Sequence, residues 1–273
     1  MHAQSSPFPP PGTDLGTCEV LVSEAANDRY WRGAAIDHPL RDAGFLYPPM
    51  AVNFTMLLVQ QSIPGGLLHT WGRLRCHAAA KAGQALQTTG SVVERFEKRG
   101  RDYCVVATEI RSADGDLLWT AETELASSQR RDTSGDTATP SRPRYEIPPG
   151  AVVTSRPLTL TADLLRTYSR AGNFHSDDDA AREMGLPGMV AMGMQTIAPA
   201  WAVVLDDVGD DLLTRGEFET RFFGLVLEDE IIDASVARDH DEWAFSVRNE
   251  TKDIPTAGGV IRLAEVASGQ KPT

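Results

Sequence analysis

The chain has 273 residues, of which 41% are hydrophobic and 23% charged, a composition typical of a folded globular protein. The formal net charge of −12 argues against nucleic-acid binding, which needs a concentrated basic surface, and disfavours anionic membranes. No apolar run approaches the roughly 20 residues that cross a bilayer, and the N-terminus lacks the basic and apolar regions of a signal peptide. Three scattered cysteines, with no phosphate loop and no metal-spaced cluster, predict a cytoplasmic location and neither a metal nor a cofactor.

The first half of the chain reads as helices followed by strands. After a Pro-rich lead-in, a helical segment is predicted around residues 13–31, and a loop containing "LYPPM" follows. Residues 51–61, "AVNFTMLLVQQ", have the apolar density of a buried helix. Alternation and β-branched residues then predict four strands, in residues 67–78, 85–100, 101–113 and 116–127. The turn residues 98–101 and 114–116 separate the last three strands.

The second half repeats this order after a polar segment with four prolines, residues 127–150. Residues 161–172 predict an amphipathic helix with Thr161 as its N-cap and Gly172 as its stop. Residues 176–185 predict a short helix capped by Ser176, with three aspartates in its first turn. A helix apolar on all sides is predicted at 189–205, and four strands follow, in residues 215–227, 229–241, 242–253 and 258–268.

A helix followed by antiparallel strands, occurring twice, predicts an α+β fold; the double hot-dog fits this order, although the periodicity alone does not distinguish it from other α+β folds. In this arrangement each of two central helices is wrapped by a curved antiparallel sheet, and the two sheets pair edge to edge. The expected organisation is a disordered lead-in, a first helix-and-sheet unit, a linker, a second helix-and-sheet unit and a tail, at residues 1–14, 15–126, 127–149, 150–265 and 266–273.

The most specific stretch is residues 168–194, "YSRAGNFHSDDDAAREMGLPGMVAMGM". It resembles the motif of the MaoC-like family of (R)-specific enoyl-thioester hydratases and dehydratases, whose double hot-dog members have a degenerate first repeat. The residues in register with that motif are His175, Asp177, Gly185, Gly193 and Met194. In the first half, "YPPM" and the hairpin of residues 95–125 resemble further signatures of those members. The resemblance implies a degenerate N-terminal hot-dog at residues 15–126 and a C-terminal hot-dog with the catalytic motif at residues 150–265.

The resemblance implies an acyl thioester substrate, carried by CoA or an acyl carrier protein, and reversible addition of water to its 2,3-double bond. His175 would be the acid/base and the N–H group of Gly193 the oxyanion donor, while Asn173 would place the water or the thioester. No cofactor is implied, and a homodimer or homo-oligomer is expected. The substrate-binding residues predicted around these three are Tyr168, Arg170, Asp177, Met192 and Met194.

Simpler structural roles remain open for several of these residues. Asp177 and the two aspartates after it suit a helix N-terminus, and Gly193 suits close packing of a helix on a sheet. Arg170 suits an ion pair with the nearby acids, and the methionines suit a core. The other histidines of interest, which are His38, His69 and His77, are predicted to be structural.

The stretch also departs from the family pattern. The family has its catalytic carboxylate five residues before the histidine, where this chain has Arg170, and its asparagine three before, where this chain has Gly172. Two other hypotheses therefore remain open. The first is a thioester isomerase or oxa-Michael cyclase, in which no water is activated. The second is a non-catalytic acyl-binding subunit of a hydratase complex.

Overall fold

The computed structural model describes residues 6–63, 66–128 and 145–265. Most of the linker predicted at 127–149, the tail predicted at 266–273 and the start of the lead-in lie outside these described residues. The first-half elements are β1 (Asp14–Leu21), α1 (Glu24–Gly33), α2 (Pro39–Asp42), the 3-10 helix η1 (Pro48–Met50), α3 (Ala51–Gln60), β2 (Leu67–Cys76), β3 (Ala85–Lys98), β4 (Arg101–Ser112) and β5 (Leu117–Ser127). The second-half elements are β6 (Val153–Thr159), α4 (Ala162–Tyr168), α5 (Asp178–Glu183), α6 (Gly193–Thr196), α7 (Ala198–Val208), α8 (Asp211–Arg215), β7 (Gly216–Phe222), β8 (Ile231–Asp239), β9 (Glu242–Asn249) and β10 (Ile254–Leu263).

The ten strands within the described residues belong to one antiparallel sheet in the order β1-β3-β4-β5-β2-β7-β10-β9-β8-β6. At the centre of the sheet β2 pairs with β7, and these strands are the inner edges of the two halves. Read outward from them, the two halves have equivalent strand orders, β2-β5-β4-β3-β1 and β7-β10-β9-β8-β6. The predicted edge-to-edge pairing of two sheets is thus confirmed. The turn predicted at 98–101 is also confirmed, since Arg99 and Gly100 take the positive φ angles, 51° and 71°, that a tight hairpin requires.

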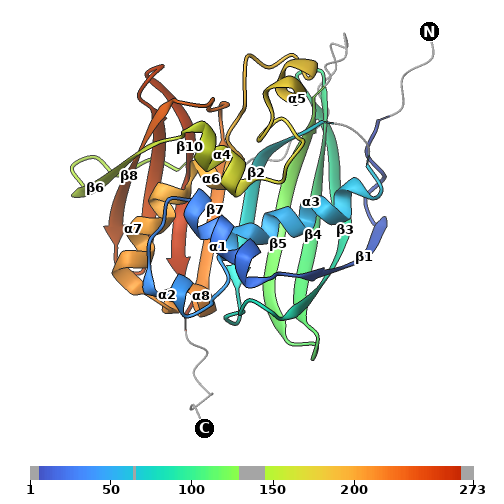
Figure 1. Ribbon diagram of the computed structural model, residues 1–273, viewed down its shortest axis with the longest axis horizontal. Helices are drawn as coiled ribbons and strands as arrows, with labels where there is room; N and C mark the ends of the chain where they lie inside the picture. The colour runs from blue at the N-terminus through green and yellow to red at the C-terminus, as the bar shows by residue number, and fades with distance from the viewer. Residues whose placement is uncertain (1–5, 64–65, 129–144, 266–273) are drawn as a thin grey trace.

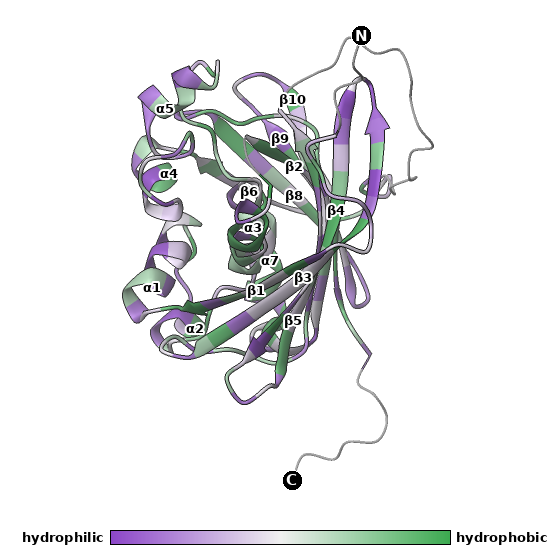
Figure 2. Cartoon of the chain, turned by 90° about the vertical axis from the view of Figure 1, so that its right-hand side faces the viewer, coloured by the Kyte–Doolittle hydropathy of each residue, from purple (hydrophilic) through white to green (hydrophobic). Residues whose placement is uncertain are grey.

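The sheet curves around two central helices, which makes the fold a double hot-dog. Figure 1 shows α3 lying across β3–β5 and α7 beside β7–β10. Figure 2 shows both helices between the sheet and an outer layer that contains α1, α4 and α5. Gly33 allows α1 to approach α4 closely, because a Cβ atom there would come within 2.6 Å of the Tyr168 backbone. This outer layer therefore joins the two halves on the side opposite the sheet.

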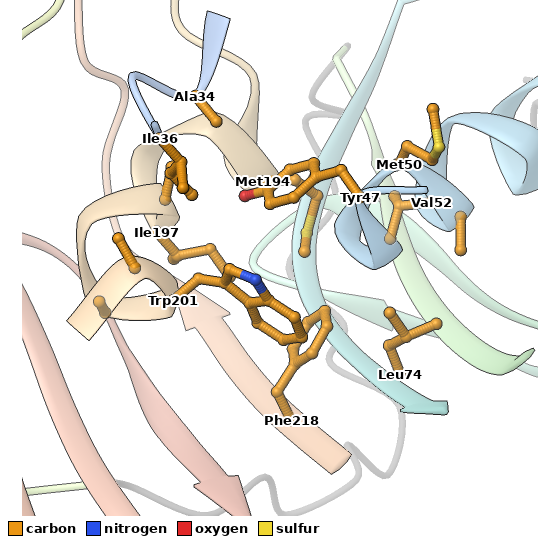
Figure 3. Close-up of a cluster of buried hydrophobic side chains, with 14 of the residues drawn as sticks. Ala34, Ile36, Tyr47, Met50, Val52, Leu74, Met194, Ile197, Trp201 and Phe218 are labelled. Carbon is orange, nitrogen blue, oxygen red and sulfur yellow. The ribbon is translucent and has the colours of Figure 1, made fainter. Parts of the chain in front are cut away.

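The hydrophobic core is continuous across the two halves. Trp201 of α7 packs edge-on against Phe218 of β7 and against Tyr47, which precedes α3, with ring centroids 5.5 Å and 6.2 Å away. Figure 3 shows this cluster, with Met194 and Leu74 beside the same rings. Burial of large aromatic side chains from both halves is the main stabilising term expected for such a fold.

The structure corrects four details of the predicted elements. Residues 14–21 form the edge strand β1 rather than part of a helix, and the unpredicted β6 forms the opposite edge. The helix predicted at 189–205 begins only at Gly193, because Val190 pairs with Leu227 in an isolated bridge. The helix capped by Thr161 ends at Tyr168 and does not continue to Gly172.

Candidate active site

A mainly apolar cavity of about 250 Å³ lies where the two halves meet. The second half contributes His175, Met192, Gly193 and Met194, together with the segment 222–226 at the end of β7 and just after it. The first half contributes α3 through residues 52, 53 and 56, and β2 through residues 67–70. The imidazole and the glycine predicted to carry the chemistry thus lie in one cavity of a size suited to a small acyl group.

The loop before α5 holds His175 in place. The side chain of Asn173 accepts hydrogen bonds from the His175 backbone N–H (2.8 Å) and the Ser169 hydroxyl (3.1 Å), and its NH₂ group donates to the Arg170 carbonyl (3.1 Å). The geometry therefore gives Asn173 the role of shaping the loop. Of the ring nitrogens of His175, Nδ1 donates to the carbonyl of Val190 at 2.7 Å, so the neutral ring keeps its free lone pair on Nε2.

Burial controls the protonation of His175. It lowers the pKa of the imidazole to about 4, although the hydrogen bond to Val190 acts in the opposite direction. The Phe174 ring lies at 3.9 Å from the imidazole, centroid to centroid, and contributes to this apolar environment. At neutral pH the ring is therefore uncharged and can accept a proton.

Gly193 begins α6 at the edge of the cavity. The first N–H groups of a helix have no acceptor within the helix, and the first intrahelical bonds here are donated by Gln195 and Thr196 to Met192. A Cβ atom at residue 193 would lie 3.0 Å from the Phe222 ring. Glycine thus lets the ring pack against the start of the helix and leaves a backbone donor beside the cavity.

A second cavity of about 150 Å³ adjoins the first, and His175, Asn53 and Met192 line both. Tyr168, Arg170 and Asn173, all predicted site residues, line this second cavity. Arg170 is exposed and forms no ion pair with any described residue, so the predicted pairing with nearby acids is wrong.

Asp177 lies in neither of these two cavities. It is exposed and caps α5, where its carboxylate accepts from the backbone N–H groups of Asp179 (2.9 Å) and Ala180 (3.0 Å). The predicted cap, Ser176, instead donates its hydroxyl to the Arg170 carbonyl at 2.6 Å. The geometry thus favours the structural reading of Asp177 over substrate binding.

His69 was predicted to be an ordinary strand residue, but it lines the main cavity. It lies at a bulge of β2, where the register shifts between His69 and Trp71, and its ring contacts Phe222 at 4.7 Å. Burial lowers its pKa to about 4, with a backbone hydrogen bond to Trp71 acting in the opposite direction. The alternation of the strand gave no sign of this position, because only the bulge and the pairing with β7 turn the ring toward the cavity.

Comparison with known proteins agrees with this geometry. Residues 146–258, which include His175 and Gly193, match the family model described as MaoC like domain. The second half of the chain is thus similar to MaoC-like domains. A curated relative, 3-hydroxyacyl-thioester dehydratase X of Mycobacterium tuberculosis, is 27% identical over 173 residues, which are 62% of this chain and 59% of the relative. The alignment thus spans about three fifths of that relative's length.

Solved structures extend the similarity to the whole fold. A MaoC-like dehydratase from Phytophthora capsici superposes with a TM-score of 0.74 at 14% identity and covers 92% of this chain and 96% of its own. A Mycobacterium tuberculosis protein described as a double hotdog fold has a TM-score of 0.55 at 14% identity, covering 90% and 93%. These likenesses show that the fold is a double hot-dog. No helix within the described residues is long and apolar enough to span a membrane.

Proposed function

We propose that the protein is a hydratase/dehydratase that interconverts 2-enoyl and 3-hydroxyacyl thioesters. The observation that carries the proposal is that His175, with a free Nε2, and the start of α6 at Gly193 line one apolar cavity. The match of residues 146–258 to the MaoC-like family model supports it, as does the similarity to a 3-hydroxyacyl-thioester dehydratase. The proposal includes CoA or an acyl carrier protein as carrier, a cytoplasmic location, a homo-oligomer and the predicted division into two hot-dog domains.

In the hydration direction His175 acts first as a base. Its Nε2 takes a proton from water while the water oxygen forms a bond to C3, and the electrons of the 2,3-double bond move through C2 onto the thioester oxygen. The imidazolium then returns the proton to C2, so the sum is addition of one water. Dehydration runs the same steps in reverse. The lowered pKa of His175, about 4, keeps the resting ring neutral at neutral pH, so that Nε2 is available to accept the proton.

The charge that develops on the thioester oxygen needs a donor. The backbone N–H of Gly193 is suited to this role because it is fixed by α6 and is not consumed by an intrahelical hydrogen bond. The absence of a side chain on Gly193 lets the thioester approach the amide.

Purified protein would be given crotonyl-CoA and longer enoyl-CoA thioesters while the absorbance of the conjugated double bond is followed. We expect hydration by the wild-type protein and at least about a 10³-fold lower kcat for His175→Ala. The matched control is His77→Ala, which removes an exposed histidine that is hydrogen-bonded to Thr120 and should leave kcat unchanged.

The same assay separates the alternatives. A product with the mass of the substrate and a shifted double bond or a new ring would indicate an isomerase or a cyclase. Binding of enoyl-CoA, seen as a raised melting temperature, without any turnover would indicate an acyl-binding subunit. Hydration at the wild-type rate by His175→Ala would refute the assignment of the base.

A further inference from the structure

Asn53 brings a polar group from the first half of the molecule to the site. It lies in α3, a helix whose other residues from 51 to 59 are apolar or threonine, and its side chain lines both cavities that His175 lines. Its Nδ2 donates to the hydroxyl of Tyr30 at 3.0 Å. Its Oδ1 is buried and accepts no hydrogen bond from any described residue.

This orientation of the amide is held by a residue of the outer layer that also lines the second cavity. Tyr30 belongs to α1, and its ring packs edge-on against Tyr168, with centroids 5.3 Å apart, at the end of the helix that precedes the His175 loop. Since Nδ2 already donates to Tyr30, the carbonyl oxygen Oδ1 is the atom of the Asn53 amide that has no hydrogen-bond partner among the described residues. A buried acceptor without a donor is costly, so it selects a ligand that supplies an N–H or O–H group.

We propose that Asn53 is a further catalytic residue, whose Oδ1 accepts a hydrogen bond from the hydroxyl group added to or removed from C3. The inference rests on the proposed function and deepens it. Of the groups on the reacting part of the substrate, only the attacking water and the 3-hydroxyl carry an O–H, whereas the thioester oxygen and the double bond have no hydrogen to donate. In hydration, one O–H of the water donates to Asn53, and the other transfers its proton to Nε2 of His175.

One residue from each half therefore takes the roles that a carboxylate and a histidine have in the family pattern. Asn53 orients the oxygen without exchanging a proton with it, and His175 carries the proton between water and C2. An isomerisation has no such oxygen to orient, so this arrangement favours water addition over the isomerase hypothesis.

The first test measures the hydration of crotonyl-CoA by Asn53→Leu and Asn53→Asp. The leucine has a similar size but no acceptor, and we expect kcat to fall roughly 30- to 100-fold while KM for the enoyl thioester changes less than about threefold. Aspartate keeps an acceptor oxygen that Tyr30 can still hold by donating its hydroxyl, so at least about a tenth of the wild-type kcat should remain. Gln61→Leu, at the exposed end of the same helix, is the control and should be unchanged.

The second test reads binding alone, in a His175→Ala background that prevents turnover. Calorimetry would compare 3-hydroxybutyryl-CoA with butyryl-CoA, which differ only in the hydroxyl. We expect His175→Ala to bind the hydroxy compound about tenfold more tightly and His175→Ala/Asn53→Leu to bind the two equally. Circular dichroism and melting temperature would show that the variants are folded.

The outcomes separate the two proposals. If Asn53→Leu keeps the wild-type kcat, or if the hydroxyl preference persists in the double variant, the role of Asn53 is refuted while the proposed function stands. If the wild-type protein fails to hydrate any enoyl thioester, but the hydroxyl preference exists and depends on Asn53, the proposed function is refuted while the binding role of Asn53 stands.

Discussion

The two halves have the same strand order around a central helix but differ at the point where that helix begins. In the first half, α3 follows Tyr47, Pro48, Pro49 and Met50, all of which are buried. The two prolines have no N–H, and the N–H groups of Met50 and Ala51 donate to the carbonyls of Tyr47 and Pro48 in the 3-10 helix η1. The start of α3 therefore offers no free donor to a ligand.

In the second half the short helix α6 precedes the central helix α7, and α6 begins at Gly193 with Met192 as its N-cap and with no proline or 3-10 helix directly before it. Its first N–H groups stay unused beside the cavity, and the loop before it carries His175. The equivalent loop of the first half carries His38, whose side chain caps α2 by accepting from the Leu40 N–H at 3.2 Å. The two halves thus differ at the start of the central helical segment, where the second half leaves backbone N–H groups and a histidine beside the cavity.

The largest loss of activity is expected when the start of α6 is made to resemble the start of α3. Gly193→Pro removes the proposed donor at the first helical position, where proline is tolerated, and Met192 already has the extended conformation, φ −66° and ψ 144°, that precedes proline. We expect kcat/KM for crotonyl-CoA to fall by at least about 10²-fold, the usual loss for one oxyanion donor.

Gly193→Ala is the matched variant, because it also places a Cβ atom 3.0 Å from the Phe222 ring but keeps the N–H. The fall in kcat/KM of Gly193→Ala reports the effect on packing alone, and we expect this fall to stay within about tenfold. Equal losses in the two variants would mean that Gly193 serves packing, as the simpler reading of the sequence holds, and not the oxyanion.

A second comparison is between the two histidines of the main cavity, His175 from the second half and His69 from the first. If His175 is the base, kcat/KM for hydration should be flat above about pH 5 and fall as the pH drops through its pKa of about 4. The measurement is the pH profile of the initial rate in enzyme that circular dichroism shows to be folded. A fall centred near pH 6.5 would contradict a buried, neutral base.

The pH dependence of stability should involve both rings. Each has a folded pKa of about 4, below the usual 6.5, so the unfolded chain binds more protons between these values. Stability should therefore be fully present above about pH 6.5 and decrease toward pH 4, by up to roughly 3 kcal/mol for each ring. His69→Leu should remove one of these two contributions, so the difference in the free energy of unfolding between pH 7 and pH 5, measured with urea, should become smaller. The pH at which the hydration rate falls should stay that of wild type.

Much of this architecture was accessible from sequence, and its limits have physical reasons. The apolar helix 51–61, the tight turn at Arg99–Gly100 and the alternating strands are local signals, and the structure confirms them. The edge strand β1 was predicted as helix because an edge strand lacks the alternation of a half-buried one; most of its residues are exposed or half-buried.

The candidate site was only half predictable. His175 and Gly193 stand in one contiguous motif, and their spacing brought them together in the prediction. Asn53 and His69 come from elements more than 100 residues away, and only the pairing of β2 with β7 brings them near His175. A lone asparagine in an otherwise apolar helix was the one available signal for Asn53, and it was read as part of the helix.

The smallest expected effect concerns the caps of the two connecting loops. Asp177 accepts from two backbone N–H groups at the start of α5, whereas His38 accepts from one at the start of α2. Asp177→Ala should therefore cost about 1 kcal/mol of stability and His38→Ala about half of that, measured by chemical denaturation, while Asp177→Asn keeps the cap. Since the cap lies outside both cavities, kcat/KM of Asp177→Ala should remain within about twofold of wild type. A larger loss of kcat/KM, with Asp177→Asn impaired as strongly, would restore the sequence-based prediction that this carboxylate acts on the substrate, because the cap alone needs no charge.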